Sequence, residues 1–160
     1  NIGIATAHAG EPMAENAPAL PVYRVGTAEE EAAGGQQYDL VLAFEILEHV
    51  ADVPLFLKSC GQLLKPDGLL FLATLNRTAK SFALAIVGAE YILRWLPRGT
   101  HDWKRFLKPS ELAASLRPQG ISLGDVCGVS YHPFTDTFVL NPGDPGVNYM
   151  AWAKRTLVSA

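Results

Sequence analysis

Two carboxylates and an imidazole directly follow an apolar segment in the first third of the chain. Glu45, Glu48 and His49 come after the apolar run 40–44. In open α/β sheets, ligands bind beyond the carboxyl ends of the strands. If the chain turns helical at Glu45, spacings of three and four residues place the three side chains on one face, where they can converge on one cation. The pattern predicts a cofactor or metal site, although Glu48 and His49 would also suit capping and orienting the helix start.

The elements around these residues indicate an α/β fold. The continuous apolar run 40–44 is typical of a strand that is covered on both faces, as in a parallel sheet. The spacing of apolar residues predicts a helix over 53–64, the sequence Lys-Pro-Asp-Gly predicts a tight turn at 65–68, and 69–74 reads as the next strand. Strand, helix and strand in this order make a right-handed crossover, and its repetition gives a three-layer sandwich.

The flanking segments are shorter and less strongly patterned. The expected elements are a helix end at 1–9, a strand at 21–25, an acidic turn at 29–31, a helix at 109–117 that begins near Pro109, and strands around 121–131 and 147–154. We expect the segment between the last two strands, which is rich in Pro, Gly and Asp, to be a long hairpin connection.

The composition indicates one globular domain, and its net charge does not favour nucleic-acid binding. The chain has 160 residues, of which 49% are hydrophobic and 18% charged, and its formal net charge is −3. Cys60 and Cys127 lie far apart in apolar surroundings without metal-ligand spacing. We therefore expect buried free thiols and no zinc site.

The segment 80–96 is unusually apolar for a surface helix. It is shorter than the roughly 20 residues that a membrane span needs, and it carries Glu90 and Arg94. Two interpretations remain open: a helix packed over the sheet, or an interfacial helix that faces lipid or a lipid-like substrate. The second would use apolar Phe82, Ile86, Ile92, Trp95 and Leu96, with basic Lys80, Arg94 and Arg98 nearby.

Five short sequence motifs, taken together, resemble those of one protein family. They are Glu-Ile-Leu-Glu-His-Val at 45–50, Leu-Leu-Lys-Pro-Asp-Gly at 63–68, Thr-Leu-Asn-Arg at 74–77, Val-Gly-Ala-Glu-Tyr-Ile-Leu-Arg at 87–94 and Arg-Gly-Thr-His-Asp-Trp at 98–103. With the Val-Asn-Tyr-Met strand at 147–150, nearly the whole chain resembles the ubiquinone-biosynthesis O-methyltransferases. These are class I enzymes of Rossmann-like fold that use S-adenosylmethionine to methylate a polyprenylated phenol or catechol.

The resemblance implies roles for residues at two places. Phe44 matches a position that contacts the cofactor, and Thr27, Ala28 and Glu29 match the segment that lies against its adenine. Glu45, Glu48 and His49 match a Glu-x-x-Glu-His element thought to bind magnesium or a similar divalent ion.

Methyl transfer to a phenol, whose pKa is near ~10, requires that the phenolate be favoured. A divalent ion could lower that pKa, or a general base could remove the proton. His101, followed by Asp102 in a loop after the apolar helix, is the candidate base or phenol-orienting group. The alternative is that His101 only braces its loop.

The resemblance also implies that residues 1–160 are a partial domain. The family opens with a helix, a strand, a Gly-x-Gly-x-Gly loop and a second strand, and this first βαβ segment has no counterpart in the chain. The family's sheet order is 3-2-1-4-5-7-6, in which the strand at 38–44 is the fourth. The chain should then be inactive by itself, with an exposed sheet edge that promotes aggregation.

The implied partners are a polyprenylated phenol substrate, a membrane contacted peripherally through 80–96, and a ubiquinone-biosynthesis complex. The implied location is the cytoplasmic face of a bacterial inner membrane, or the matrix side of the mitochondrial one. Two other functions stay open: another class I methyltransferase that acts on a different small molecule, and a non-catalytic lipid-binding subunit. A Gly-x-Gly-x-Gly loop encoded upstream of Asn1 would indicate the enzyme.

The first prediction concerns cofactor binding by these 160 residues alone. Because the glycine loop is not among them, millimolar S-adenosylhomocysteine should leave their melting temperature unchanged in a thermal-shift assay. Stabilisation by the ligand would contradict this expectation.

Overall fold

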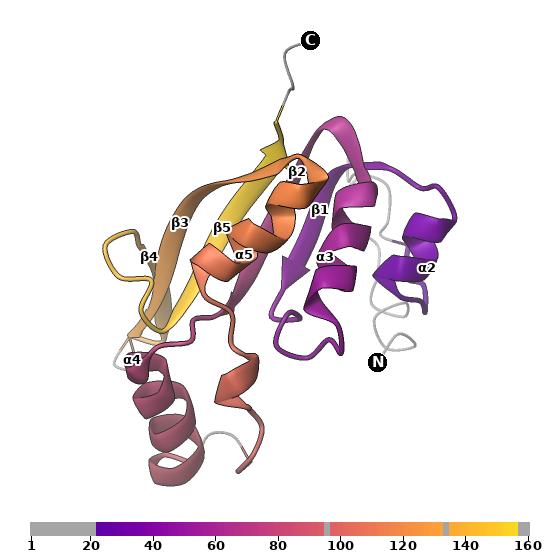
Figure 1. Ribbon diagram of the computed structural model, residues 1–160. Helices are drawn as coiled ribbons and strands as arrows, with labels where there is room; N and C mark the ends of the chain where they lie inside the picture. Colours follow the sequence, from indigo (N-terminus) through magenta and orange to yellow (C-terminus); the bar gives the residue numbers. More distant parts are fainter. Residues whose placement is uncertain (1–21, 95–96, 133–134, 157–160) are drawn as a thin grey trace, which may run out of the picture.

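A computed structural model describes residues 22–94, 97–132 and 135–156 (Figure 1). The helices are α2 (Ala28–Ala33), α3 (Val53–Gln62), α4 (Ala79–Ser81), the π-helix η1 (Phe82–Ile92), the 3₁₀-helix η2 (Trp103–Arg105), α5 (Pro109–Leu116) and the 3₁₀-helix η3 (Arg117–Gln119). The strands are β1 (Tyr38–Phe44), β2 (Leu64–Leu75), β3 (Ile121–His132), β4 (Thr137–Asn141) and β5 (Asn148–Arg155).

The strands form one mixed sheet in the order β1-β2-β5-β3-β4. β1 and β2 are parallel, and the other neighbours are antiparallel. The strands β1, β2, β5 and β3, in their order across the sheet, correspond to strands 4, 5, 7 and 6 of the order that the resemblance implies. The prediction of a plain hairpin connection before the last strand was wrong, because residues 137–141 pair with β3 as a further strand.

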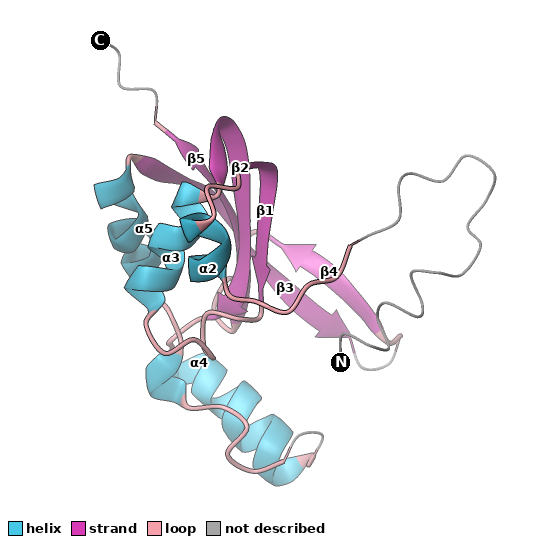
Figure 2. Cartoon of the chain, turned by 90° about the vertical axis from the view of Figure 1, so that its right-hand side faces the viewer, coloured by secondary structure: helices cyan, strands magenta, loops and turns pink. Residues whose placement is uncertain are grey.

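The helices α2, α3 and α5 lie on one face of the sheet (Figure 2). Apolar side chains from α3, α5 and the central strands form the core between them, and those fully buried include Leu57, Leu64, Leu70, Leu72, Leu112, Leu116 and Tyr149. The run 40–44 was expected to be covered on both faces, but Leu42 is 57% exposed and Leu40 and Phe44 are also exposed. Within the described residues, β1 is therefore covered on one face only.

The Lys-Pro-Asp-Gly segment interrupts the pairing of β2 with β1. Tyr38 pairs with Leu64, whereas Leu40 pairs with Leu69, so residues 65–68 bulge out of the register. A side chain at Gly68 would place its Cβ 2.9 Å from the carbonyl oxygen of Tyr38. The predicted turn is thus an excursion within a longer strand, and it needs glycine at its close approach.

Two N-terminal predictions were wrong within the described residues. Residues 22–25 form no strand; Pro21 and the helix expected at 1–9 lie outside the described residues. Glu29 and Glu31 belong to the first turn of α2 instead of an acidic turn. Thr27 and Glu30 form a reciprocal capping box there, and acidic side chains are favourable at a helix N-terminus.

The apolar segment extends beyond the lower end of the sheet in Figure 1 and does not cover a face of it. Its backbone is a π-helix, and Leu84, Tyr91, Ile92 and Leu93 are exposed. The packed-over-sheet interpretation is therefore wrong. No helix among residues 22–94, 97–132 and 135–156 is long and apolar enough to cross a bilayer.

The predictions from composition meet a mixed result. Cys60 is buried and free as expected, and burial raises the pKa of its thiol to about 12, whereas free Cys127 is only half-buried.

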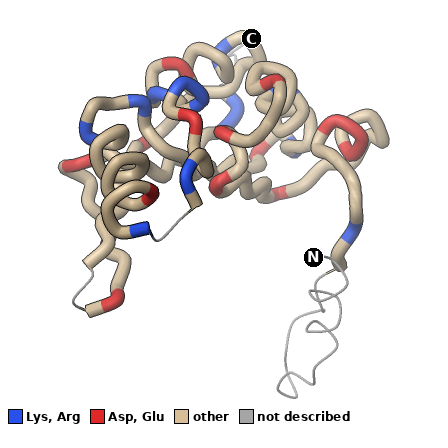
Figure 3. The backbone as a smooth tube through the Cα atoms, turned by 90° about the horizontal axis from the view of Figure 1, so that it is seen from below, with Lys and Arg blue, Asp and Glu red and all other residues tan. Residues whose placement is uncertain are grey.

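Basic and acidic positions are interspersed along the described backbone (Figure 3).

Candidate functional site

The first polar residue after β1 has an uncommon backbone conformation. Glu45 has a φ of 49°, in the left-handed region that non-glycine residues rarely occupy. Its N–H donates to the carbonyl oxygen of Ala73 at 2.9 Å, which holds it against the end of β2. Such residues cluster at ligand sites because the surrounding structure must keep them in place.

The chain then forms a turn, not the helix expected to start at Glu45. The N–H groups of His49 and Val50 both donate to the carbonyl oxygen of Ile46, at 2.9 and 3.2 Å. Helix α3 begins only at Val53, where the Asp52 carboxylate accepts from the N–H of Leu55 at 2.9 Å. Helical spacing therefore does not align the three predicted ligands.

Glu45 and Glu48 instead form a pair of carboxyl groups. Glu48 is buried and accepts a 2.7 Å hydrogen bond from the hydroxyl of Thr74 on β2. The Glu45 residue is exposed as a whole, but its carboxyl group loses hydration to the surrounding protein. This loss, followed by the charge of Glu48 and a hydrogen bond to it, raises the pKa of Glu45 from 4.5 to about 7.

The predicted metal ligands do not converge. His49 is exposed, and no group of three or more His, Cys, Asp or Glu side chains within the described segments is arranged to hold an ion. The described geometry therefore does not gather the three side chains into one site, and their role as metal ligands stays a prediction. The left-handed residue and the turn after it replace the helix that was expected to align them.

One of the two predicted cofactor contacts, the segment 27–29, adjoins a hollow of about 550 Å³. Gly26, Thr27, Ala28 and Glu29 line one side of it, and residues of the β1–α3 loop and the start of α3 line the other, namely Ile46, Val50, Ala51, Asp52, Leu55 and Phe56. Its size is within the range of small-molecule sites. Phe44 is not part of its lining but is exposed at the tip of β1.

The candidate base, His101, contacts the carboxylate of Glu90, a contact that the sequence did not predict. His101 lies in the loop between η1 and η2, and its Nδ1 is 3.0 Å from a carboxylate oxygen of Glu90. Asp102 caps η2 by accepting from the N–H of Lys104 at 3.0 Å. The signal for Glu90 was present in the sequence, as a single acidic residue within the apolar run 81–93.

The segment that follows the His101 loop is attached to the end of β2 and to the β1–α3 loop. The N–H of Leu107 donates to the carbonyl oxygen of Leu75 at 3.1 Å. The guanidinium of Arg105 donates to the carbonyl oxygen of Val50 at 3.2 Å. These bonds hold residues 105–107 at the edge of the sheet where β2 ends.

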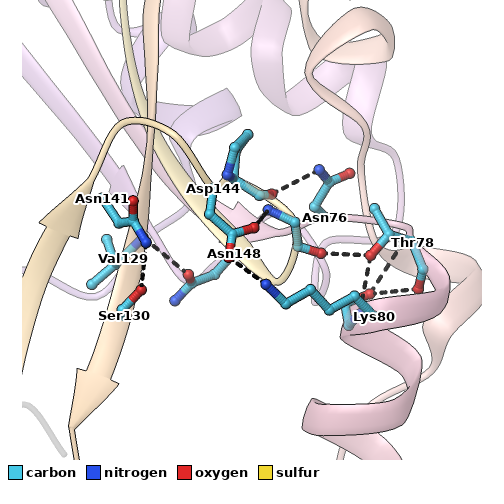
Figure 4. Close-up of polar contacts among 11 residues, drawn as sticks. Asn76, Thr78, Lys80, Val129, Ser130, Asn141, Asp144 and Asn148 are labelled. Carbon is cyan, nitrogen blue, oxygen red and sulfur yellow. Dashed lines mark hydrogen bonds and ion pairs between the residues drawn. The ribbon is translucent and has the colours of Figure 1, made fainter.

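A second polar network fixes the start of the apolar helix (Figure 4). Lys80 forms an ion pair with Asp144, and the Thr78 hydroxyl donates to the carbonyl oxygen of Gly146. Asn76 donates to the carbonyl oxygen of Pro145 at 2.9 Å, and its buried Oδ1 accepts no hydrogen bond from the described residues. Helix η1 is thereby attached to the β4–β5 loop.

Comparisons with known proteins agree with this architecture. Residues 3–125 match the family described as "methyltransferase domain". A ubiquinone biosynthesis O-methyltransferase of Parvibaculum lavamentivorans is 50% identical over 97% of this chain, which spans 59% of that protein's length. Magnesium protoporphyrin IX methyltransferase from Synechocystis with bound SAH is 19% identical, with a TM-score of 0.62 over 97% of this chain and 59% of that one.

A methyltransferase from Methanosarcina mazei is 16% identical, with a TM-score of 0.65 over 98% of this chain and 77% of that chain. At these identities the solved structures bear on the fold alone. They confirm the predicted fold class, the Rossmann-like fold of class I methyltransferases.

The second prediction follows from the raised pKa of Glu45. Between pH 4.5 and about 7 the folded protein keeps a proton that the unfolded chain has released, so this group's contribution to stability is present below pH 4.5 and lost as the pH rises through 7. Glu45→Gln should therefore melt a few degrees above the unmodified protein at pH 8, with no such difference at pH 4.

Scanning calorimetry across this pH range would measure the difference. Asp67→Asn, which changes an exposed carboxylate at the opposite end of β2, is the matched control and should show no comparable pH-dependent gain. Equal stability differences at both pH values for Glu45→Gln would contradict the prediction.

Proposed function

The chain belongs to the methyltransferase-domain family, and on that premise we propose that the protein methylates a phenol oxygen of a polyprenylated catechol-like intermediate of ubiquinone biosynthesis, using S-adenosylmethionine. The observation that carries the substrate class is the 50% identity to a ubiquinone biosynthesis O-methyltransferase. The chain spans about three fifths of that relative's length, so the activity is proposed for the whole gene product.

The hollow beside α2 is suited to the adenine half of the cofactor. One wall of the hollow is the N-terminal end of α2, formed by Thr27, Ala28 and Glu29. The opposite wall is apolar and includes Ile46 and Leu55. Phe44, exposed at the tip of β1, would contact the cofactor between this hollow and the acceptor. When bound, the cofactor supplies an electrophilic methyl group on a positively charged sulfur.

His101 would remove the phenol proton. Its ring is held by Glu90, and the segment that follows its loop is bonded to the end of β2 and to the β1–α3 loop. No step is assigned to a metal ion, because Glu45, Glu48 and His49 do not converge. Asp102 caps η2, which suits a role in holding the loop.

The third prediction is that His101→Ala lowers the turnover of the complete gene product by about 100-fold or more, as expected for loss of a general base. Methyl transfer from labelled S-adenosylmethionine to a short-chain prenylated catechol would measure it. His132→Ala, which removes an exposed imidazole at the end of β3, is the matched control and should retain activity. A loss below threefold for His101→Ala would rule out the proposed base.

We also propose that η1 contacts a membrane peripherally, which would bring the enzyme to its lipid-like substrate. The helix presents exposed Leu84, Ile92 and Leu93, and basic Arg94 and Arg98 follow it on exposed positions. Exposed apolar surfaces with basic residues beside them bind the headgroup region of anionic bilayers. The proposed location is the cytoplasmic face of a bacterial inner membrane, within a ubiquinone-biosynthesis complex.

The fourth prediction tests this contact. The complete gene product should sediment with liposomes that contain phosphatidylglycerol, and Ile92→Glu should reduce the bound fraction several-fold. Ile92 is 71% exposed, so the change removes lipid contact without disturbing a core. Val139→Glu alters an exposed residue of β4 that does not line the hollow beside η1, and it serves as the control, which should sediment like the unmodified protein. Undiminished sedimentation of Ile92→Glu would refute the proposed surface.

A further inference from the structure

The apolar helix η1 has a buried acid among exposed hydrophobic side chains. Glu90 is 1% exposed, while its neighbours Tyr91 and Ile92 point to solvent. An ionised carboxylate is costly to bury unless hydrogen bonds replace the water that it loses. A glutamate in this position therefore needs a specific set of donors.

Three donors from one loop meet the Glu90 carboxylate. The N–H of Gly99 donates to Oε2 at 2.7 Å, and the N–H of His101 donates to Oε1 at 2.9 Å. The Nδ1 of His101 is 3.0 Å from the same Oε1. Burial opposes the charged form, but these hydrogen bonds and the nearby imidazole outweigh it, and the pKa of Glu90 is lowered.

The ionised carboxylate determines how the imidazole is protonated. A carboxylate can only accept hydrogen bonds, so Nδ1 of His101 must carry a proton and donate it. The neutral ring then has its lone pair on Nε2, the nitrogen that does not face Glu90. The ring of Phe106 packs edge-on against the imidazole, with centroids 5.9 Å apart, and restricts its rotation.

His101 also borders an open hollow of about 730 Å³. Phe82, Val87 and Tyr91 of η1 line one side of it, and Trp103 lines the other. Aromatic and aliphatic walls with one imidazole suit a phenol that carries an apolar tail. The site therefore combines apolar contact with one oriented proton acceptor.

The π-helical register gives this arrangement its uncommon backbone. The register continues to the N–H of Leu93, which donates to the carbonyl oxygen of Gly88, five residues earlier, at 2.8 Å. Long runs of this register are rare, and π-helical turns are frequent at functional sites. The whole helix is fixed at its start by the ion pair of Lys80 with Asp144.

We infer that Glu90 is a positioning residue that holds His101 with Nδ1 protonated and Nε2 free to accept the proton of the methyl acceptor. This inference rests on the proposed function. The phenol O–H bond breaks and its proton goes to Nε2; the oxygen's electron pair forms a bond to the methyl carbon, and the C–S bond breaks with its electron pair remaining on sulfur. Glu90 stabilises the imidazolium that results, because their charges are opposite.

The test replaces Glu90 with glutamine in the complete gene product. The amide has the shape of the carboxyl group but no charge, and its oxygen can still accept from the N–H and the Nδ1 of His101, so Glu90→Gln removes the charge alone. Glu90→Leu also removes the acceptor of the Nδ1 proton. Nitrogen-15 NMR of the labelled imidazole should show a proton on Nδ1 in the unmodified protein and in Glu90→Gln, and on Nε2 in Glu90→Leu. Turnover of a short-chain prenylated catechol should fall about 100-fold or more, with little change in KM.

Asp144→Asn is the matched control, because it breaks the ion pair at the start of η1 without touching the imidazole. It should keep the Nδ1-protonated form and most of the turnover. Glu90→Asp, which retains the charge, should recover part of the activity lost in Glu90→Gln.

The readouts separate the inference from the proposed function. An Nε2-protonated ring in the unmodified protein, or an unchanged tautomer in Glu90→Leu, overturns the role of Glu90 whatever the acceptor is. A changed tautomer with unchanged turnover also overturns it, because the orientation would not matter to the reaction. Failure of the unmodified protein to methylate any prenylated catechol would refute the proposed function, while the tautomer could still be measured.

Discussion

The parallel pairing of β1 with β2 is the constraint on which the functional edge of this fold depends. The register runs from Leu40 with Leu69 to Phe44 with Ala73, so both strands end side by side. The β1–α3 loop and the segment 105–107 meet there, because they are hydrogen-bonded to the end of β2 and to each other. Glu45 is bonded to Ala73, the Leu107 N–H to Leu75, and Arg105 to Val50.

The sequence predicted those parts of the structure that local patterns determine. The apolar run before Glu45, the helix start near Val53 and the helix start at Pro109 were all found, because alternation, capping residues and proline act within a few positions. The fold class followed from the resemblance, whose motifs extend over most of the chain. The roles of Thr27 and Phe44 as cofactor contacts remain predictions.

What the sequence could not predict depends on contacts between distant residues. The left-handed conformation of Glu45 is maintained by a hydrogen bond to β2, and without it a helical continuation would align Glu48 and His49 as expected. Strand β4 forms because residues 137–141 pair with β3, although Pro and Gly in the flanking sequence favour a loop. The π register of η1 is rare, and a nearly uniform apolar run shows no periodicity from which the register could be predicted.

Two glutamates with opposite pKa shifts show why the proton acceptor is assigned to His101. Glu45 loses hydration beside another carboxyl group, so its pKa rises to about 7 and the pair holds a proton near neutral pH. Glu90 has almost no accessible surface, yet two backbone N–H groups and an imidazole donate to it, so its pKa is lowered. Donors stabilise the charged form at Glu90, whereas lost hydration and a neighbouring carboxyl group oppose it at Glu45. An ionised carboxylate can both orient an imidazole and stabilise it once protonated, and within the described residues Glu90 and His101 provide that combination.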